Sequence, residues 1–161
     1  MELTLWPAYD RAEELRPLYE AYAAMLVAGD PVFAASLAQQ HYDEELAHLG
    51  EKYAPPGGRI YLLTADGEAA GCVGLRRIDS DTGELKRLYV RPAFRGRALG
   101  RLLTERIIAD ARAAGYRRLR LDTLPFLTHA IALYRALGFY DIDCYYDCLV
   151  PGTIFMELSL D

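Results

Sequence analysis

The chain has 161 residues, of which 52% are hydrophobic and 25% are charged, and its formal net charge at pH 7 is −5. This length and composition fit one domain over residues 1–161 and exclude an intrinsically disordered chain. The net negative charge disfavours a general nucleic-acid binder, and no apolar run is long enough to span a membrane. No basic stretch followed by an apolar run opens the chain, so we expect no secretory signal and a cytoplasmic location.

Charge is distributed unevenly along the chain. Residues 76–120 carry thirteen basic and five acidic groups, whereas the remaining residues carry five basic and eighteen acidic groups. The basic segment therefore suits an anionic ligand, although a solvated surface would have the same composition.

The three cysteines, Cys72, Cys144 and Cys148, are odd in number and lack a second pair at zinc spacing. We expect reduced thiols and no metal.

The part of the chain before residue 55 is predicted to be helical. Asp10 is a candidate N-cap for a helix whose apolar residues recur at helical spacing and which ends at Gly29-Asp30-Pro31. A second helix is expected over much of residues 33–50. The stretch Pro55-Pro56-Gly57-Gly58 then breaks the chain.

Strand signals follow this break. Residues 59–65 and 69–78 flank Asp66-Gly67, a hairpin turn signal, and a third strand is predicted over 84–90. Together they predict an antiparallel meander.

The C-terminal part is predicted to alternate helices and strands. Residues 98–114 form an amphipathic helix, and the strand at 117–122 should lie parallel to the third strand of the meander. A short helix at 128–137 and strands near 139–148 and 153–160 complete an α+β fold with a mixed sheet.

The segment 84–103, ELKRLYVRPAFRGRALGRLL, is the most informative. A strand leads through a glycine-containing loop into a helix, where Gly96 and Gly100 allow a ligand to approach the backbone closely. The free N–H groups and positive dipole of the helix N-terminus favour phosphate. The segment therefore predicts a diphosphate site, although glycines that merely permit tight packing would look alike. Neither a P-loop nor a G-x-G-x-x-G fingerprint is present. Four arginines add positive charge around the loop: Arg91, Arg95, Arg97 and Arg101.

These residues closely resemble the acetyl-CoA motif of the GNAT N-acetyltransferase superfamily, [Q/R]-x-x-G-x-[G/A]. Arg95 fills the first position and Gly100 the last, while Ala98 stands beside them where glycine is usual. A second segment, residues 130–139 (AIALYRALGF), resembles the signature A-x-x-L-Y-x-x-x-G-F of the same family. Leu127 replaces an asparagine that the family often carries seven residues before the tyrosine of this signature, here Tyr134. The order of elements also matches along essentially the whole chain, in the manner of a bacterial subgroup.

The resemblance implies a mostly antiparallel central sheet of six or seven strands flanked by about four helices. It implies direct transfer of an acetyl group from acetyl-CoA to a primary amine in a ternary complex. The acceptor would be a small-molecule amine or a peptide N-terminus. Two alternatives stay open: a catalytically silent acyl-CoA-binding regulatory module, and an acetyltransferase acting on charged tRNA. A homodimer through the final hairpin also stays open.

The resemblance further implies which residues form the site. Tyr134 matches the tyrosine that protonates the CoA sulfur. Glu84 matches a glutamate that acts as base through water, and burial would have to raise its pKa. Alternation along the strand predicts that Glu84, Lys86, Leu88 and Val90 share one face. The residues expected to bind the thioester, pantetheine and diphosphate are Leu88, Tyr89, Val90, Arg95, Gly96, Arg97, Ala98, Leu99, Gly100 and Arg101. Candidates for the acceptor pocket are Tyr42, Asp43, Glu45, Tyr53, Arg76, Tyr145, Tyr146 and Asp147.

Overall fold

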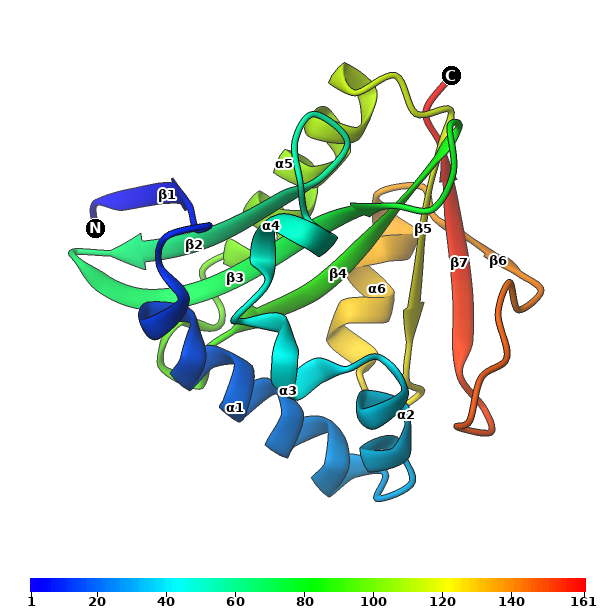
Figure 1. The fold of residues 1–161 in the computed structure, drawn as a ribbon, viewed down its shortest axis with the longest axis horizontal. Coiled ribbons are helices and arrows are strands. Elements are labelled where there is room, and N and C mark those ends of the chain that lie inside the picture. The colour runs from blue at the N-terminus through cyan, green and yellow to red at the C-terminus, as the bar shows by residue number, and fades with distance from the viewer.

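A computed structural model describes all residues 1–161 and shows one seven-stranded sheet in the order β1-β2-β3-β4-β5-β7-β6 (Figure 1). Only β4 and β5 are parallel neighbours, and the other pairs are antiparallel. The strands are β1 (Leu3–Pro7), β2 (Arg59–Ala65), β3 (Glu68–Arg77), β4 (Thr82–Val90), β5 (Arg118–Thr123), β6 (Tyr140–Ile142) and β7 (Ile154–Ser159). The helices are α1 (Ala12–Gly29), α2 (Phe33–Gln39), α3 (Tyr42–Glu45), α4 (Leu49–Lys52), α5 (Leu99–Ala113) and α6 (Thr128–Ala136), with a 3₁₀ turn η1 (Pro92–Phe94). The expected α+β architecture is confirmed.

The two faces of the sheet carry separate apolar cores. Alternating residues of β2 divide between them: Ile60 and Leu62 pack with α1–α4, and Tyr61 and Leu63 pack with α5. Burial of both faces explains why β2 reads as a nearly continuous apolar run. None of the helices is both long and apolar enough to cross a membrane.

The parallel strands β4 and β5 separate soon after they begin. They pair only where Thr82–Glu84 meets Arg118–Arg120, whereas β4 continues to Val90. Beyond Glu84, β4 has a strand neighbour only on its β3 side. Figure 1 shows the two strands close together near the C-terminus and diverging toward the end of the sheet that faces α1 and α2. This divergence splits the sheet into two halves.

A β-bulge in β4 accompanies the divergence. Cys72 pairs with Tyr89 and Gly74 pairs with Lys86, so β4 has one residue more than β3 between these pairs. Arg87, inside the bulge, has a φ of 62°, in the left-handed region that costs a non-glycine residue about 1–2 kcal/mol. A bulge bends its strand and increases the local twist. The bulge therefore helps to turn β4 away from β5.

The side-chain alternation predicted along this strand is wrong beyond the bulge. Simple alternation predicts one common face for four side chains: Glu84, Lys86, Leu88 and Val90. The extra residue inverts the pattern, so Leu88 and Val90 pack against the core on the α5 side. Tyr89 instead packs with α1 and its neighbours. A period-2 pattern cannot reveal such an insertion, because the inverted residues remain apolar on both sides.

A buried ion pair stabilises the bulge. Arg87 donates from Nε to Oε2 of Glu45 at 3.0 Å and from Nη2 to Oε1 at 2.8 Å, and both side chains are at most 3% exposed. The carboxylate also accepts hydrogen bonds from Tyr19, Tyr53 and Lys52. Burial alone would raise the pKa of Glu45, but Arg87 and Lys52 hold it well below its ordinary value of 4.5. The pair thus ties β4 to α3.

The expected elements match the structure best where periodicity is strong. β2 occupies 59–65 as predicted, and α5 and α6 end before Gly115 and Gly138, whose φ values are 88° and 102°. The expected N-cap is wrong, because Arg11 precedes α1 and makes no side-chain cap hydrogen bond. The strand β1, which pairs with β2, was not predicted.

Two longer predicted elements are interrupted in the structure. The helix expected over 33–50 is divided into α2, α3 and α4, and His41 between the first two has a φ of 55°. The strand expected near 139–148 contains only β6, because Tyr145 and Tyr146 leave the sheet edge and donate hydrogen bonds to Glu84 and Asp122.

We expect Glu45→Gln to lower the free energy of unfolding by about 3 kcal/mol, because Arg87 stays buried without its counter-charge. Folding lowers the pKa of Glu45, so its stabilisation is complete above pH 4.5 and is lost as the pH falls. Urea titrations of the variant should therefore show a weaker loss of stability with acid than the wild type. Glu51→Gln, at a side chain that is 78% exposed, is the control. Unchanged stability of Glu45→Gln would contradict the role of the pair.

Candidate active site

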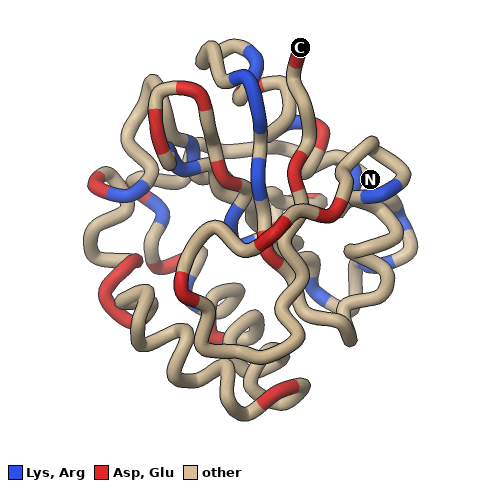
Figure 2. Tube along the Cα trace, turned by 90° about the vertical axis from the view of Figure 1, so that its right-hand side faces the viewer, with Lys and Arg blue, Asp and Glu red and all other residues tan.

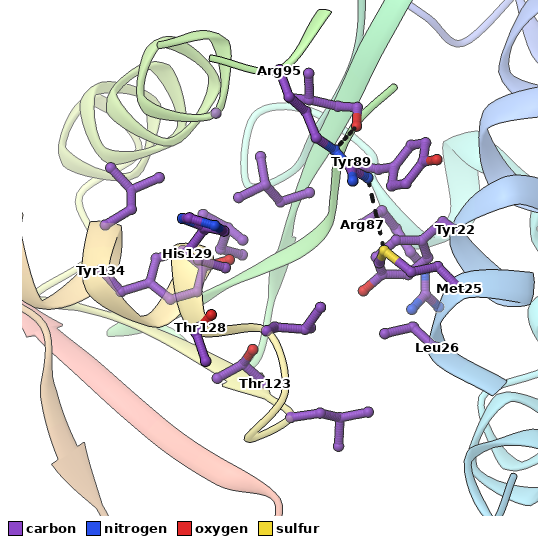
Figure 3. A pocket seen from close by; sticks show the side chains of 18 of the residues that line it. Tyr22, Met25, Leu26, Arg87, Tyr89, Arg95, Thr123, Thr128, His129 and Tyr134 are labelled. Carbon is purple, nitrogen blue, oxygen red and sulfur yellow. Dashed lines mark hydrogen bonds between the residues drawn. The ribbon is translucent and has the colours of Figure 1, made fainter. Parts of the chain in front are cut away.

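A cavity of about 880 Å³ lies where β4 and β5 separate, and we call it the cleft. Its walls come from β4, the loop before α5, the end of β5, α6 and α1. Figure 3 shows Tyr22, Met25 and Leu26 of α1 on one side and His129 and Tyr134 of α6 on the other. The cleft thus reaches both core-bearing faces of the divided sheet.

One end of the cleft is the loop that leads into α5. Gly96 has a φ of 80° and Ala98 a φ of 58°, so the loop turns twice through the left-handed region before the helix begins. Gly96 needs its glycine for this conformation. Gly100 differs, because a Cβ there would meet no protein atom closer than Leu133 at 3.7 Å. The protein has room for a side chain at Gly100, so the open space in front of its backbone is available to a ligand.

The arginines around this loop differ in their partners. Arg101 pairs with Glu105 at 2.7 Å and Arg91 lies 3.6 Å from Glu68. Arg95 has no carboxylate partner, and its Nε donates to the carbonyl of Val90 at 3.0 Å. Its side chain reaches across the cleft mouth toward Met25 (Figure 3). Arg95 therefore keeps its positive charge free beside the start of α5.

The structure brings nearly all of the expected cofactor residues together. Arg97 is the exception, because it does not line the cleft and its Nη1 lies 3.0 Å from Sδ of Met1. The remaining nine line one continuous wall: Leu88, Tyr89, Val90, Arg95, Gly96, Ala98, Leu99, Gly100 and Arg101. The backbone of β4 in this wall has no strand partner on its β5 side.

Tyr134 lies in the wall formed by α6 (Figure 3). Its ring packs against Phe139 with centroids 5.6 Å apart. Its hydroxyl takes part in none of the side-chain hydrogen bonds and is not a buried orphan, so it is accessible from the cleft. Burial, followed by the nearby Tyr22 and Asp122, raises the pKa of Tyr134 well above its ordinary value. The hydroxyl is therefore protonated at neutral pH and free to donate.

Glu84 lies where β4 and β5 begin to separate and does not line the cleft. Its two oxygens accept hydrogen bonds from Arg76 Nε and the Tyr145 hydroxyl, both at 2.6 Å. Burial alone would raise its pKa, but Lys86, Arg76 and Tyr145 together lower it. The raised pKa that was expected for Glu84 as a base is therefore not found. The sequence could not reveal this, because it gives no sign that Arg76 and Lys86 lie around this carboxylate.

Three charged residues that line the cleft were missed as site residues: Asp122, Lys86 and Arg87, the last of which is paired with Glu45. Asp122, at the end of β5, accepts a hydrogen bond from Tyr146 on Oδ2, and Oδ1 has no protein donor. Lys86, on β4, donates to Oε1 of Gln40 at 2.9 Å. The signal for Asp122 was its position at the carboxyl end of a parallel strand, where α/β sheets commonly bind ligands.

The expected acceptor-pocket residues divide into two groups. Tyr42, Glu45 and Tyr53 are buried in the network around Arg87 and do not line the cleft. Arg76, Tyr145 and Tyr146 contact the carboxylates of Glu84 and Asp122 beside it. Neither Asp43 nor Asp147 lines the cleft.

The structure shows neither a reactive thiol in the core nor a metal-ligand cluster. Cys72 is buried, and burial raises the pKa of its thiol to about 12. No group of three or more ligating side chains could hold a metal ion.

Comparison with known proteins identifies this arrangement. The acetyltransferase (GNAT) family model matches residues 15–139, which include β4, the loop, α5 and α6. The chain belongs to the GNAT family. An uncharacterized N-acetyltransferase of Schizosaccharomyces pombe is 40% identical over 131 residues, which are 80% of each chain.

Solved structures show the same GNAT fold. An acetyltransferase from Streptococcus agalactiae has a TM-score of 0.79 at 23% identity, with 98% of each chain covered. The PaiA N-acetyltransferase from Thermoplasma acidophilum, solved in complex with coenzyme A, has a TM-score of 0.78 at 18% identity and 99% coverage of both chains. This GNAT chain is an acyltransferase with acetyl-CoA as its co-substrate.

The residues present fit acetyl-CoA. The free N–H groups at the start of α5, the unpaired Arg95 and the uncovered backbone of Gly100 suit the diphosphate. The unpaired edge of β4 offers backbone groups to the amide-bearing pantetheine arm. Ala98 takes the left-handed conformation despite its Cβ, so the departure from the family motif preserves the shape of the loop.

We expect Gly100→Glu to raise the dissociation constant of CoA at least about tenfold, because its carboxylate would lie beside the diphosphate and repel it. The fold should tolerate the change, since the protein atom nearest to a Cβ there is 3.7 Å away and glutamate favours a helix. Calorimetric titration and thermal unfolding of the same samples measure both effects. Gly50→Glu, at a position where a Cβ meets no atom within 4 Å, is the matched control. Wild-type affinity in Gly100→Glu would place the diphosphate elsewhere.

Proposed function

We propose that this chain transfers the acetyl group of acetyl-CoA directly to a primary amine while both substrates are bound. The observation that carries the proposal is the continuity of the cleft. One cavity extends from the start of α5, past Tyr134, to Asp122 and Lys86. Two substrates can therefore meet inside it, with the thioester between the diphosphate end and a second, charged end.

Tyr134 acts as the general acid in this proposal. The amine nitrogen forms a bond to the thioester carbon, and the carbon–sulfur bond breaks with its electron pair left on sulfur. The Tyr134 hydroxyl, which is accessible from the cleft, donates its proton to this sulfur. Its raised pKa keeps it protonated until the thiolate forms.

Asp122 receives the proton that the acceptor ammonium must lose before it attacks. The second nitrogen proton, which is lost as the amide forms, restores the Tyr134 hydroxyl. Its Oδ1 is free, and the Tyr146 hydroxyl fixes the orientation of the carboxylate through Oδ2. Glu84 has a positioning role, because it orients Tyr145 and lies close to Lys86 while its own oxygens are occupied. This assignment departs from the expectation that Glu84 itself is the base.

Tyr134→Phe tests the acid. We expect kcat to fall about 100-fold with little change in the KM for acetyl-CoA, since only a proton donor is lost. Thiol release from acetyl-CoA in the presence of a broad amine panel provides the assay. Tyr140→Phe, at a ring that is 46% exposed outside the cleft, is the control. Full activity of Tyr134→Phe would remove it from the mechanism, and CoA binding without turnover of any amine would favour a silent binding module.

Asp122→Asn and Glu84→Gln together test the base. We expect Asp122→Asn to lower kcat about 100-fold and to remove the acidic limb of the kcat/KM profile against pH. Glu84→Gln should retain that limb, because its carboxylate does not face the cleft. The opposite outcome, an acidic limb lost only in Glu84→Gln, would restore Glu84 as the base.

A further inference from the structure

Lys86 is a buried cation with unused hydrogen-bonding capacity. Its side chain is only 10% exposed, and its ammonium donates one hydrogen bond, to Gln40. The nearest carboxylate oxygen, on Glu84, is 3.8 Å away and already accepts from Arg76 at 2.6 Å. A lysine ammonium has three N–H donors, so two are free at the wall of the cleft.

The charges around Lys86 do not balance. Glu45 is shared by Arg87 and Lys52, and Glu84 is shared by Arg76 and Lys86. Four cations therefore share two carboxylates, and counting Asp122, which also acts on Lys86, an excess of one positive charge remains. Arg87 and Lys86 are the most buried of these cations, at 3% and 10% exposed. Burying unpaired charge is costly, and burial together with the nearby Arg87 lowers the pKa of Lys86. An anion bound at Lys86 would offset this cost.

The cleft contains only one acid, Asp122, which lies on β5 across the split from Lys86. The two residues are close enough for the Asp122 charge to counter part of the decrease in the Lys86 pKa. Figure 2, which views the β6–β7 side, shows basic and acidic positions interspersed along the chain. A polyamine would thus meet one carboxylate and one lysine, whereas an acceptor with both an ammonium and a carboxylate would pair with each.

The acetyl-CoA end does not require this lysine. The diphosphate is served by the start of α5 and by Arg95, and the thioester and pantetheine arm carry no charge. The free donors of Lys86 are therefore available to the second substrate. Tyr22 and Phe33, which also line the cleft, add apolar surface to it.

We propose that the acceptor is an amine that also carries a carboxylate, such as an amino acid, and that Lys86 binds this carboxylate while Asp122 faces the amine. The inference rests on the proposed amine acetylation and adds the chemical class of its substrate. Lys86 is thereby a specificity residue.

Matched acceptors test the proposal directly. Phenylalanine and glutamate are compared with their α-amides and with the corresponding decarboxylated amines, and spermidine represents polyamines. We expect kcat/KM for at least one amino acid to exceed that of its amide and amine by at least about 30-fold. Equal or faster acetylation of the amides, amines or spermidine would overturn the inference while leaving amine acetylation intact.

Variants at Lys86 assign the preference to this residue. Lys86→Met should raise the KM for the preferred amino acid at least about 30-fold, with a smaller change in kcat, and Lys86→Arg should recover part of the loss. Lys52→Met removes a lysine of the same cluster that does not line the cleft, so it should keep the preference. Unchanged CoA affinity verifies that each variant is folded. Loss of the preference in Lys52→Met but not in Lys86→Met would overturn the assignment.

A binding measurement separates this inference from the proposed reaction. Calorimetric titration of the CoA-loaded protein with the amino acids and their amides requires no turnover. We expect an amino acid to bind to the wild type and to bind at least about tenfold more weakly to Lys86→Met, even if acetyl transfer is absent. Equal affinity for acid and amide in the wild type would contradict the carboxylate site, whatever the catalytic result.

Discussion

The ion pair between Arg87 and Glu45 is the constraint on which the site depends. It holds a non-glycine residue at positive φ inside a bulge, and the bulge helps to turn β4 away from β5. The separated strand then exposes backbone on one side, and the space between the strands is the cleft. A strained conformation persists only where its surroundings overdetermine it, and here the surroundings include two tyrosines, a lysine and a bidentate pair.

The cleft has two ends with different electrostatics, joined at Tyr134. At the α5 end, a helix N-terminus and Arg95 provide positive potential without counter-charge. At the other end, Lys86 and Asp122 provide both signs on facing halves of the sheet. A diphosphate suits the first end, and a molecule with an amine and a carboxylate suits the second. This division lets one cavity orient two substrates so that the amine meets the thioester rather than the phosphates.

The sequence predicted local features well, but it predicted contacts between residues that are distant along the chain poorly. The loop before α5 was predicted because its glycines, arginines and following amphipathic helix are contiguous. The bulge at Arg87 was not, since one inserted residue leaves an apolar strand looking regular. Glu84 was placed on the correct strand, but Arg76 and Tyr145 contact it from segments that no spacing rule connects. Asp122 and Lys86 were missed for a similar reason, because their relation exists only across the split sheet.

If the divergence of β4 from β5 creates the acetyl-CoA site, CoA must bind along the edge of β4 that faces β5. Amide hydrogen exchange of the wild-type protein, with and without saturating CoA, locates the bound cofactor. We expect new protection concentrated in residues 88–90 and 95–101, the unpaired edge of β4 and the loop into α5. Protection confined to other segments, with these residues exchanging as in the free protein, would contradict it.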